Sequence, residues 1–222
     1  MKNSIFPKYI FILLFIILIC QTFYYYPKLP DIIGSHYNVA GEAHGWMQKN
    51  IFFITIISIF SFLFILLLSL PYFIDKLPLS IVNFPNKYLW FNKSIYEKTK
   101  DKIIITLYIF NIGLFLFIIF TNQLTITANL NETNLNIKYF FLGLIIFFIF
   151  IIFWAIKIFL NFSKKNYLLC VRDNFFNNEN LKKDETLNLL GNLKEKLITN
   201  NIKINKKEYS FEDFKDIFLK LK

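Results

Sequence analysis

The sequence predicts an all-α fold: a polytopic membrane protein with four transmembrane helices and a small, mostly helical tail. Three observations predict this class: the composition is unusually apolar, the apolar residues gather in four long windows, and the basic residues lie mainly between alternate windows. Hydrophobic residues make up 55% of the 222-residue chain and charged residues 18%, against roughly 45–50% and about 25% in soluble domains. An ordinary soluble domain is therefore excluded.

Each apolar window has close to the length that a membrane span requires, which is about 20 residues for roughly 30 Å of hydrocarbon. The windows are rich in Ile and Phe, which also favour strands, but an open sheet leaves backbone groups unsatisfied in lipid. No window contains an acidic residue. We therefore predict helical spans at residues 9–26, 51–73, 103–121 and 139–160, within a membrane domain that covers residues 1–160.

The basic residues predict which side of the membrane each loop faces, because Lys and Arg accumulate in cytoplasmic segments. With the N-terminus inside, 22 of the 25 basic residues lie on the cytoplasmic side, and only Lys28, Lys49 and Lys138 lie outside. The prediction is an N-in, C-in protein. Three acidic residues balance the three outer lysines, so the cytoplasmic side carries the whole formal net charge of +10.

Few polar groups interrupt the spans, and their spacing favours contacts between helices. Asn111 lies midway along the third span, and Thr55, Ser58 and Ser61 recur at helical spacing on the second. Small residues allow helices to approach closely, and an Asn can hydrogen-bond across an interface. No span contains Asp, Glu or His. This disfavours a pump or a coupled transporter, since these usually need an ionisable group inside the membrane.

The composition changes abruptly at the cytoplasmic tail, residues 161–222, which carries 13 basic and 9 acidic residues. Asp184–Thr199 has the pattern of an amphipathic helix, and an apolar stripe follows it at Phe211, Phe214, Phe218 and Leu221. These two helices either pack on each other as a small lobe or offer a docking surface to a cytoplasmic protein or to anionic lipid. Nucleic acid is not a predicted partner, because basic and acidic residues alternate and Arg172 is the lone arginine.

The first outer loop, residues 27–50, contains more than a connector between two spans needs. Both histidines of the chain, three of its six glycines and two of its six prolines lie here. Prolines fix backbone torsions, and Gly41 and Gly45 can supply turns with positive φ. Tyr26 and Trp46 suit the membrane interface. We therefore predict that this loop has a defined shape.

The residue types alone leave four interpretations of this loop open. His36, Glu42 and His44 form a two-histidine, one-carboxylate set of the kind that binds a metal ion, with Asp31 as a fourth ligand or as a partner to a ligand. A catalytic interpretation takes His36 as a base that Asp31 orients. In a structural interpretation, Asp31 caps a turn and His36 bonds to the loop backbone. In the fourth, the ordered loop recognises a peptide or another ligand.

The loop also resembles a known family in the order and spacing of its residues. The string runs Pro27-x-Leu29-Pro30-Asp31, four residues, His36-x-Asn38-x-x-Gly41-Glu42, then Trp46 and Lys49. It is similar to the bacterial membrane family of the domain of unknown function sixteen-forty-eight, a module that also forms the N-terminal part of SdpI-type immunity proteins. Two departures are His44, where the family typically has Asp, and the apolar pair Ile32-Ile33, where a more polar stretch is common.

A second string lies in the cytoplasmic loop between the second and third spans. Its residues resemble the Asn-x-Pro-Asn-Lys-x-x-Trp pattern of compact members of the same family and are Asn83, Pro85, Asn86, Lys87 and Trp90. From the residues themselves, this string is either a segment that joins two spans, with Trp90 at the membrane interface, or a docking site for a cytoplasmic regulator. The resemblance covers about residues 8–160 and leaves the tail unmatched.

The leading hypothesis is a non-enzymatic integral membrane protein, in contact with the lipid bilayer, that uses the ordered loop 27–50 for recognition on the outer side. No cofactor is expected under this hypothesis. The resemblance implies a multi-pass protein of the bacterial cytoplasmic (inner) membrane with a role in immunity or signalling. Two alternatives stay open: a metal-dependent membrane enzyme that uses His36, Glu42 and His44, and a membrane-anchored scaffold that acts through its tail.

Overall fold

The computed structural model describes residues 2–73, 90–91, 96–163 and 166. The chain divides into two units, the first made of residues 1–77 and 100–157 and the second of residues 78–99 and 158–222. Along the chain the elements are α1 (Lys2–Tyr25), the 3-10 helix η1 (Tyr26–Lys28), β1 (Ile32–Tyr37), β2 (Ala43–Gln48), α2 (Lys49–Phe73), α4 (Tyr96–Leu130) and α5 (Ile137–Asn161).

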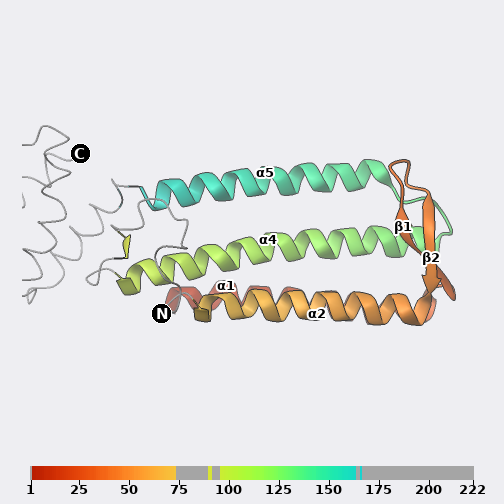
Figure 1. The fold of residues 1–222 in the computed structure, drawn as a ribbon, viewed down its shortest axis with the longest axis horizontal. Coiled ribbons are helices and arrows are strands. Elements are labelled where there is room, and N and C mark those ends of the chain that lie inside the picture. Colours follow the sequence, from red (N-terminus) through yellow and green to blue (C-terminus); the bar gives the residue numbers. More distant parts are fainter. Residues whose placement is uncertain (1, 74–89, 92–95, 164–165, 167–222) are drawn as a thin grey trace, which may run out of the picture. The chain divides into compact units, whose positions relative to one another are not determined.

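The four α-helices of the described residues are long and apolar enough to cross a membrane, and they coincide with the four predicted spans (Figure 1). The predicted all-α class is confirmed, because most of the described residues are helical. The sequence did not predict the two-stranded sheet that β1 and β2 form between α1 and α2. The arrangement is that of a multi-pass membrane protein with a small β-hairpin between its first two spans.

The helix that contains the third span extends beyond the predicted window at both ends. α4 has 35 residues, which corresponds to about 52 Å at 1.5 Å per residue and exceeds the roughly 30 Å of hydrocarbon in a bilayer. The apolar window, residues 103–121, stops where polar residues begin at Asn122. Those polar residues continue the helix, because their side chains hydrogen-bond to neighbouring elements while the backbone stays helical.

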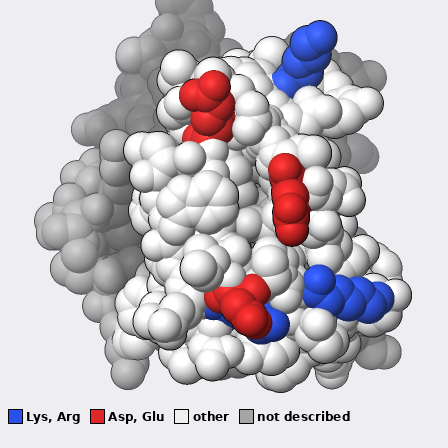
Figure 2. All heavy atoms as spheres, turned by 90° about the vertical axis from the view of Figure 1, so that its right-hand side faces the viewer, with Lys and Arg blue, Asp and Glu red and all other residues white. Residues whose placement is uncertain are grey.

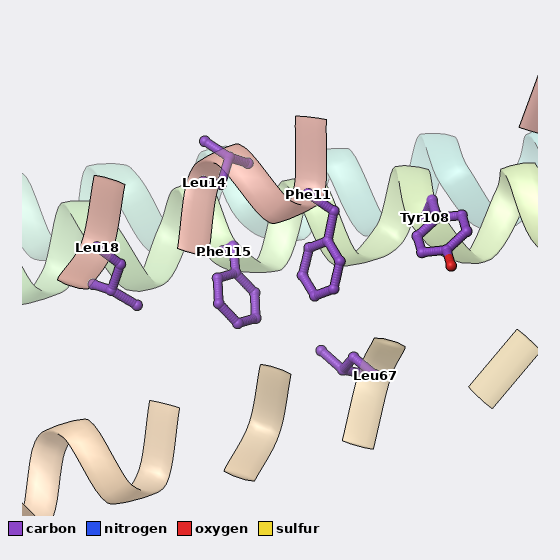
Figure 3. Packing of buried hydrophobic residues seen from close by; sticks show 6 residues of the cluster. All are labelled: Phe11, Leu14, Leu18, Leu67, Tyr108 and Phe115. Atoms are coloured by element: carbon purple, nitrogen blue, oxygen red, sulfur yellow. The ribbon is translucent and has the colours of Figure 1, made fainter. Parts of the chain in front are cut away.

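Helices α1, α2 and α4 pack around a shared cluster of apolar side chains in the first unit (Figure 3). Phe11 and Phe115 are fully buried and meet edge to face, with ring centroids 4.9 Å apart. The buried members of the cluster are Phe11, Leu14, Leu18, Leu67, Tyr108 and Phe115. Since lipid tails are as apolar as these side chains, the helices associate through close van der Waals contact rather than through the hydrophobic effect.

Helix α5 packs on α4 in a different way, with aromatic rings that lie over glycines. No residue of α5 is fully buried. A Cβ added at Gly113 of α4 would lie 2.2 Å from the ring of Phe150, and one added at Gly143 of α5 would lie 2.3 Å from the ring of Phe120. The glycines therefore let the two helices approach closely at two points.

The predicted contacts of polar residues between spans are confirmed for one residue and wrong for two others. Asn111 is buried, and its Nδ2 donates to the carbonyl oxygen of Leu67 in α2 over 3.4 Å. Thr55 and Ser58 are exposed on α2. The helix buries the face that carries Leu67 instead, and Ser61 is half-buried.

Candidate functional site

The segment predicted as an ordered loop is a β-hairpin at one end of the helices of the first unit (Figure 1). β1 and β2 are antiparallel, with Ile33 opposite Met47 and Gly34 opposite Trp46, and the register shifts after Gly34. Ile33 is buried, whereas Ile32 and Trp46 are 61% and 62% exposed. The hairpin therefore turns one apolar face toward the helices and leaves a second apolar face open.

Asn38 closes the turn between the two strands. Its Oδ1 accepts the backbone N–H of Ala40 at 2.9 Å and that of Glu42 at 3.0 Å, and its Nδ2 donates to Oε2 of Glu42 at 2.9 Å. The backbone N–H of Gly41 donates to the Asn38 carbonyl at 2.9 Å. An Asn side chain that substitutes for backbone in this way stabilises a turn. The Asn-x-x-Gly-Glu part of the motif is thus one structural unit.

Gly41 docks this turn on the connection between α4 and α5. Its φ is +83°, in the region that residues with a Cβ rarely adopt. Its carbonyl accepts the N–H of Leu135 at 2.8 Å, and a Cβ at this position would lie 2.3 Å from the carbonyl oxygen of Leu135. Both the backbone conformation and the close approach require a glycine here.

The side chain of Asn129, near the end of α4, holds the edge of β1. Its Oδ1 accepts the Gly34 N–H at 2.7 Å, and its Nδ2 donates to the Gly34 carbonyl at 3.1 Å and to the hydroxyl oxygen of Tyr37 at 2.9 Å. The amide thus makes both bonds that a neighbouring strand would make and protects this sheet edge. Burial raises the pKa of the Tyr37 hydroxyl above 10.0, and the bond from Asn129 acts in the opposite direction.

Lys49 joins the two ends of the hairpin segment where α2 begins. Its N–H donates to the Asp31 carbonyl at 2.8 Å, and its Nζ donates to the Leu29 carbonyl at 3.0 Å and lies 3.1 Å from Oδ1 of Asp31. The Lys49 side chain is 18% exposed and that of Asp31 is 98% exposed. Because exposed ion pairs contribute little to stability, the bond to the Leu29 backbone matters more than the pair with Asp31.

A groove of about 340 Å³ lies between the open face of the hairpin and the end of α4. Pro30, Ile32 and Trp46 supply apolar wall, and Asn129 lies on the α4 side. Two carboxylates, those of Glu42 and Glu132, line the groove, and none of the lining residues is Lys, Arg or His. The remaining lining residues are Tyr37, Ala43, Ala128, Thr133 and Asn134. Figure 2 views this end of the first unit and shows charged side chains scattered over a largely uncharged surface.

The end of α4 places Glu132 at this groove through a specific helix termination. The N–H of Thr133 donates to the Ala128 carbonyl at 2.9 Å, and Glu132 has a φ of 51°. This is the pattern of a Schellman turn, in which the left-handed residue is usually Gly. A negative side chain is also unfavourable beside the negative end of a helix dipole. Glu132 therefore departs from two local preferences at once.

The predicted metal set of His36, Glu42 and His44 is not brought together. The centroids of the two imidazole rings are 6.4 Å apart, and the Glu42 carboxylate lies in the turn, where it accepts a bond from Asn38. No group of three His, Cys, Asp or Glu side chains lies close enough to hold a metal ion among residues 2–73, 90–91, 96–163 and 166. The turn holds the carboxylate away from the two strand histidines.

The predicted catalytic pair is not assembled either. The Asp31 carboxylate lies 3.1 Å from Nζ of Lys49, while Nδ1 of His36 lies 2.9 Å from Oγ of Ser35. Asp31 is the residue before β1, and His36 lies five residues further on, near the end of that strand. Their side chains thus contact different partners.

The second predicted string lies largely outside the described residues, as do the tail helices Asp184–Thr199 and Phe211–Leu221. The string residues concerned are Asn83, Pro85, Asn86 and Lys87. Trp90 is fully buried, and its Nε1 donates to the carbonyl of Phe162 at 2.8 Å within the second unit. The Trp90 ring is therefore enclosed by protein, and its position at a membrane interface stays a prediction.

Sequence reasoning missed Asn129 and Glu132, which help to build the groove. A signal for Asn129 was present: Asn122, Thr125 and Asn129 follow the third span at spacings of three and four, on one face of a helix. Asn122 and Asn129 are buried. Glu132 has no comparable signal, because a left-handed Glu after a helix cannot be distinguished in sequence from an ordinary loop residue.

The bundle and its hairpin define the class: a multi-pass membrane protein whose first two spans enclose an ordered β-hairpin. The family model described as Domain of unknown function (DUF1648) matches residues 12–74. The matched residues cover most of α1, the hairpin and α2. No match was found among curated proteins. No solved structure matches the chain.

Proposed function

We propose that this chain is a non-enzymatic protein of the bacterial inner membrane that recognises an extracytoplasmic ligand at the groove on its hairpin. The observation that carries the proposal is that the hairpin is held in place at three separate points. Lys49 holds its base, Gly41 holds its turn against Leu135, and Asn129 holds the edge of β1. A site that is already ordered before binding loses less conformational entropy when a ligand arrives.

The groove also has the composition of a binding site. Its apolar wall, with Trp46 exposed at 62%, is combined with a few polar groups, as in most small-ligand sites. Exposed aromatic residues with a polar surround are frequent anchors in protein recognition. The residues of the catalytic interpretation, His36 and Asp31, are engaged with Ser35 and Lys49. These features support binding rather than catalysis.

The orientation of the groove rests on the distribution of basic residues. With the hairpin outside, 22 of the 25 basic residues lie in the cytoplasm, as the positive-inside rule favours. The test uses a full chain in which Cys20 and Cys170 are replaced by Ser and Val39 by Cys. Val39 is 88% exposed in the turn, so an impermeant maleimide should label it in intact cells. Labelling only after lysis would reverse the orientation.

Immunity to a peptide toxin, or signalling, is the role that the resemblance to the SdpI-type module supports. Cells without the chain should become sensitive to at least one peptide in a broad panel of membrane-active toxins. The wild-type chain should restore resistance, and Trp46→Ala should not. The matched control is Gln48→Ala, which removes an exposed side chain of the same strand that does not line the groove.

Two results would contradict the proposal. Unchanged sensitivity across the whole panel would remove the protective role. Full complementation by Trp46→Ala, at a membrane level equal to that of wild type and Gln48→Ala, would show that the groove is not the recognition surface. Membrane levels are compared on the same samples by quantitative immunoblotting, so that a failure to accumulate is not mistaken for a failure to bind.

A further inference from the structure

We infer that the groove on the hairpin binds a basic, partly apolar peptide segment, with Glu42 and Glu132 facing its positive charges. This inference rests on the proposed recognition function and names the chemistry of its ligand. Glu42 comes from the hairpin turn and Glu132 from the end of α4, and both line the groove. No basic residue lines it, so an anionic ligand would be repelled and a cationic one attracted.

The negative potential of the groove has a third source in the fold. α4 ends at Leu130, and the carbonyl end of a helix carries about half a negative elementary charge. Glu132 lies two residues beyond this end, with a φ of 51° in a position that normally takes Gly. A residue that opposes both the helix dipole and the backbone preference is typical of a functional position. The unfavourable backbone conformation and helix-dipole interaction of Glu132 are explained if its carboxylate is needed at the groove.

Asp31, the third acidic residue at the hairpin end of the first unit, differs from Glu42 and Glu132. Asp31 does not line the groove, and its carboxylate lies 3.1 Å from Nζ of Lys49. Glu42 accepts a bond from the neutral amide of Asn38, which leaves its charge uncompensated. No Lys, Arg or His nitrogen lies within 4.0 Å of the Glu42 or Glu132 carboxylates in the part of the chain that the structure describes.

The apolar wall favours a peptide over a simple cation. Trp46 and Ile32 are large and more than half exposed, and Trp46 offers a ring face on which a lysine or arginine can lie as a cation–π contact. A metal ion would use none of this surface. An extended peptide with alternating basic and apolar side chains would use both the carboxylates and the apolar wall.

The test measures peptide binding to the full chain in nanodiscs of phosphatidylcholine, by isothermal titration calorimetry against empty nanodiscs. The probe is a capped tetrapeptide of alternating leucine and lysine, and the comparison peptide has glutamate in place of lysine. The basic peptide should bind more tightly than the acidic one, and more tightly at low ionic strength. Glu42→Gln combined with Glu132→Gln should weaken its binding about ten-fold, the loss expected for two exposed charge pairs.

The control is Asp31→Asn, which removes a carboxylate from the same end of the molecule but not from the groove and should leave binding unchanged. Gln at position 42 can still accept the bond from Asn38, so the turn should persist. Glu132→Gly should weaken peptide binding while the thermal midpoint rises or stays the same, because Gly suits the left-handed position. This variant separates loss of binding from loss of folding.

Equal binding of the basic and acidic peptides, or no effect of the double Gln variant, would overturn the inference. If binding is lost in Trp46→Ala but not in the double Gln variant, the groove recognises apolar surface and only the ligand class is wrong. Saturable binding of Ca²⁺ that requires both carboxylates would instead make the groove a cation site and would also overturn it. The proposed function fails separately, in the toxin challenge.

Discussion

The middle of the helical bundle and its hairpin end are held together by different kinds of contact. In the middle, rings such as Phe11 and Phe115 meet at 4.9 Å without a hydrogen bond between them. At the hairpin end, contacts are directed: the Asn129 amide bonds to Gly34, and the Leu135 N–H bonds to the Gly41 carbonyl. Apolar contacts gain little specificity against lipid, so the directed bonds are what fix the groove.

A small polar cluster separates these two regions. Gln21 of α1 donates to Oε1 of Gln123 at 2.7 Å and accepts from Nδ2 of Asn122 at 3.0 Å. Such bonds between helices tie α1 to α4 just below the hairpin that α1 leads into. The transition from aromatic packing to hydrogen bonding therefore occurs along α4, at the point where its apolar window ends.

The largest expected effect is at the turn of the hairpin. Gly41→Ala should destabilise the protein by about 1–3 kcal/mol for the left-handed backbone alone, and more because the new Cβ meets the Leu135 carbonyl. Hydrogen exchange of residues 32–48 should accelerate in the full chain. Val39→Ala, in the same turn but 88% exposed, is the control and should change neither quantity. Equal effects of the two substitutions would show that the turn is not docked.

Removing the Asn129 amide should have the next largest effect. Asn129→Ala leaves the Gly34 N–H buried without its partner, at a cost of about 1–3 kcal/mol. Exchange should accelerate at β1, while the helices below keep their protection. Asn131→Ala, at an exposed position two residues further on, is the matched control. If β1 exchanges at the wild-type rate in Asn129→Ala, the amide does not hold the strand edge.

A substitution in the bundle should affect the packing of the helices without affecting the hairpin. Gly113→Ala brings a Cβ against the Phe150 ring, and the ring edge can turn aside, so the cost should be near the lower limit for overpacking, about 1 kcal/mol. The thermal midpoint should fall, with exchange of the hairpin unchanged. Adding Phe150→Leu should recover part of the loss. Faster exchange at β1 in Gly113→Ala would show that the two regions are coupled.

Much of the helical part was predictable, because the length and hydropathy of an apolar window identify a membrane span. The window around Phe60 begins two residues after α2 begins and ends at the same residue, and the window around Phe11 ends within one residue of α1 but begins seven residues later. The C-terminal part of α4 was not predictable from the same signal, since Asn122 and Asn129 lower hydropathy while their side chains find partners on α1 and β1. Helix length there depends on tertiary hydrogen bonds rather than on apolar content.

The hairpin was predicted as an ordered segment but not as two strands. Gly34 and Gly45, which weaken a strand in isolation, both lie within strands. A Cβ at Gly34 would lie 3.0 Å from the Cβ of Ala43, so this glycine reflects a close approach that sequence does not reveal. The set of His36, Glu42 and His44 is not brought together for a related reason, since sequence spacing cannot show that Glu42 lies in the turn beside Asn38.

The smallest expected effect is a pH dependence at the junction of the hairpin and α4. Burial raises the pKa of the Tyr37 hydroxyl above 10.0, so the folded state keeps this proton at a pH at which the unfolded chain has lost it. The resulting contribution to stability is complete below about pH 10 and is lost as the pH rises through the folded-state pKa. Thermal unfolding of the full chain should therefore show a steeper alkaline decline for wild type than for Tyr37→Phe.

Tyr24→Phe, at an exposed tyrosine on α1, controls for the titration of the remaining tyrosines, because its alkaline decline should be no shallower than that of wild type. Parallel declines of wild type and Tyr37→Phe would mean either that the bond from Asn129 cancels the effect of burial on the Tyr37 pKa or that the hydroxyl is solvated in the folded protein. With a solvated hydroxyl, the contact of the Asn129 amide with β1 would be limited to Gly34, the residue at which the amide replaces a neighbouring strand.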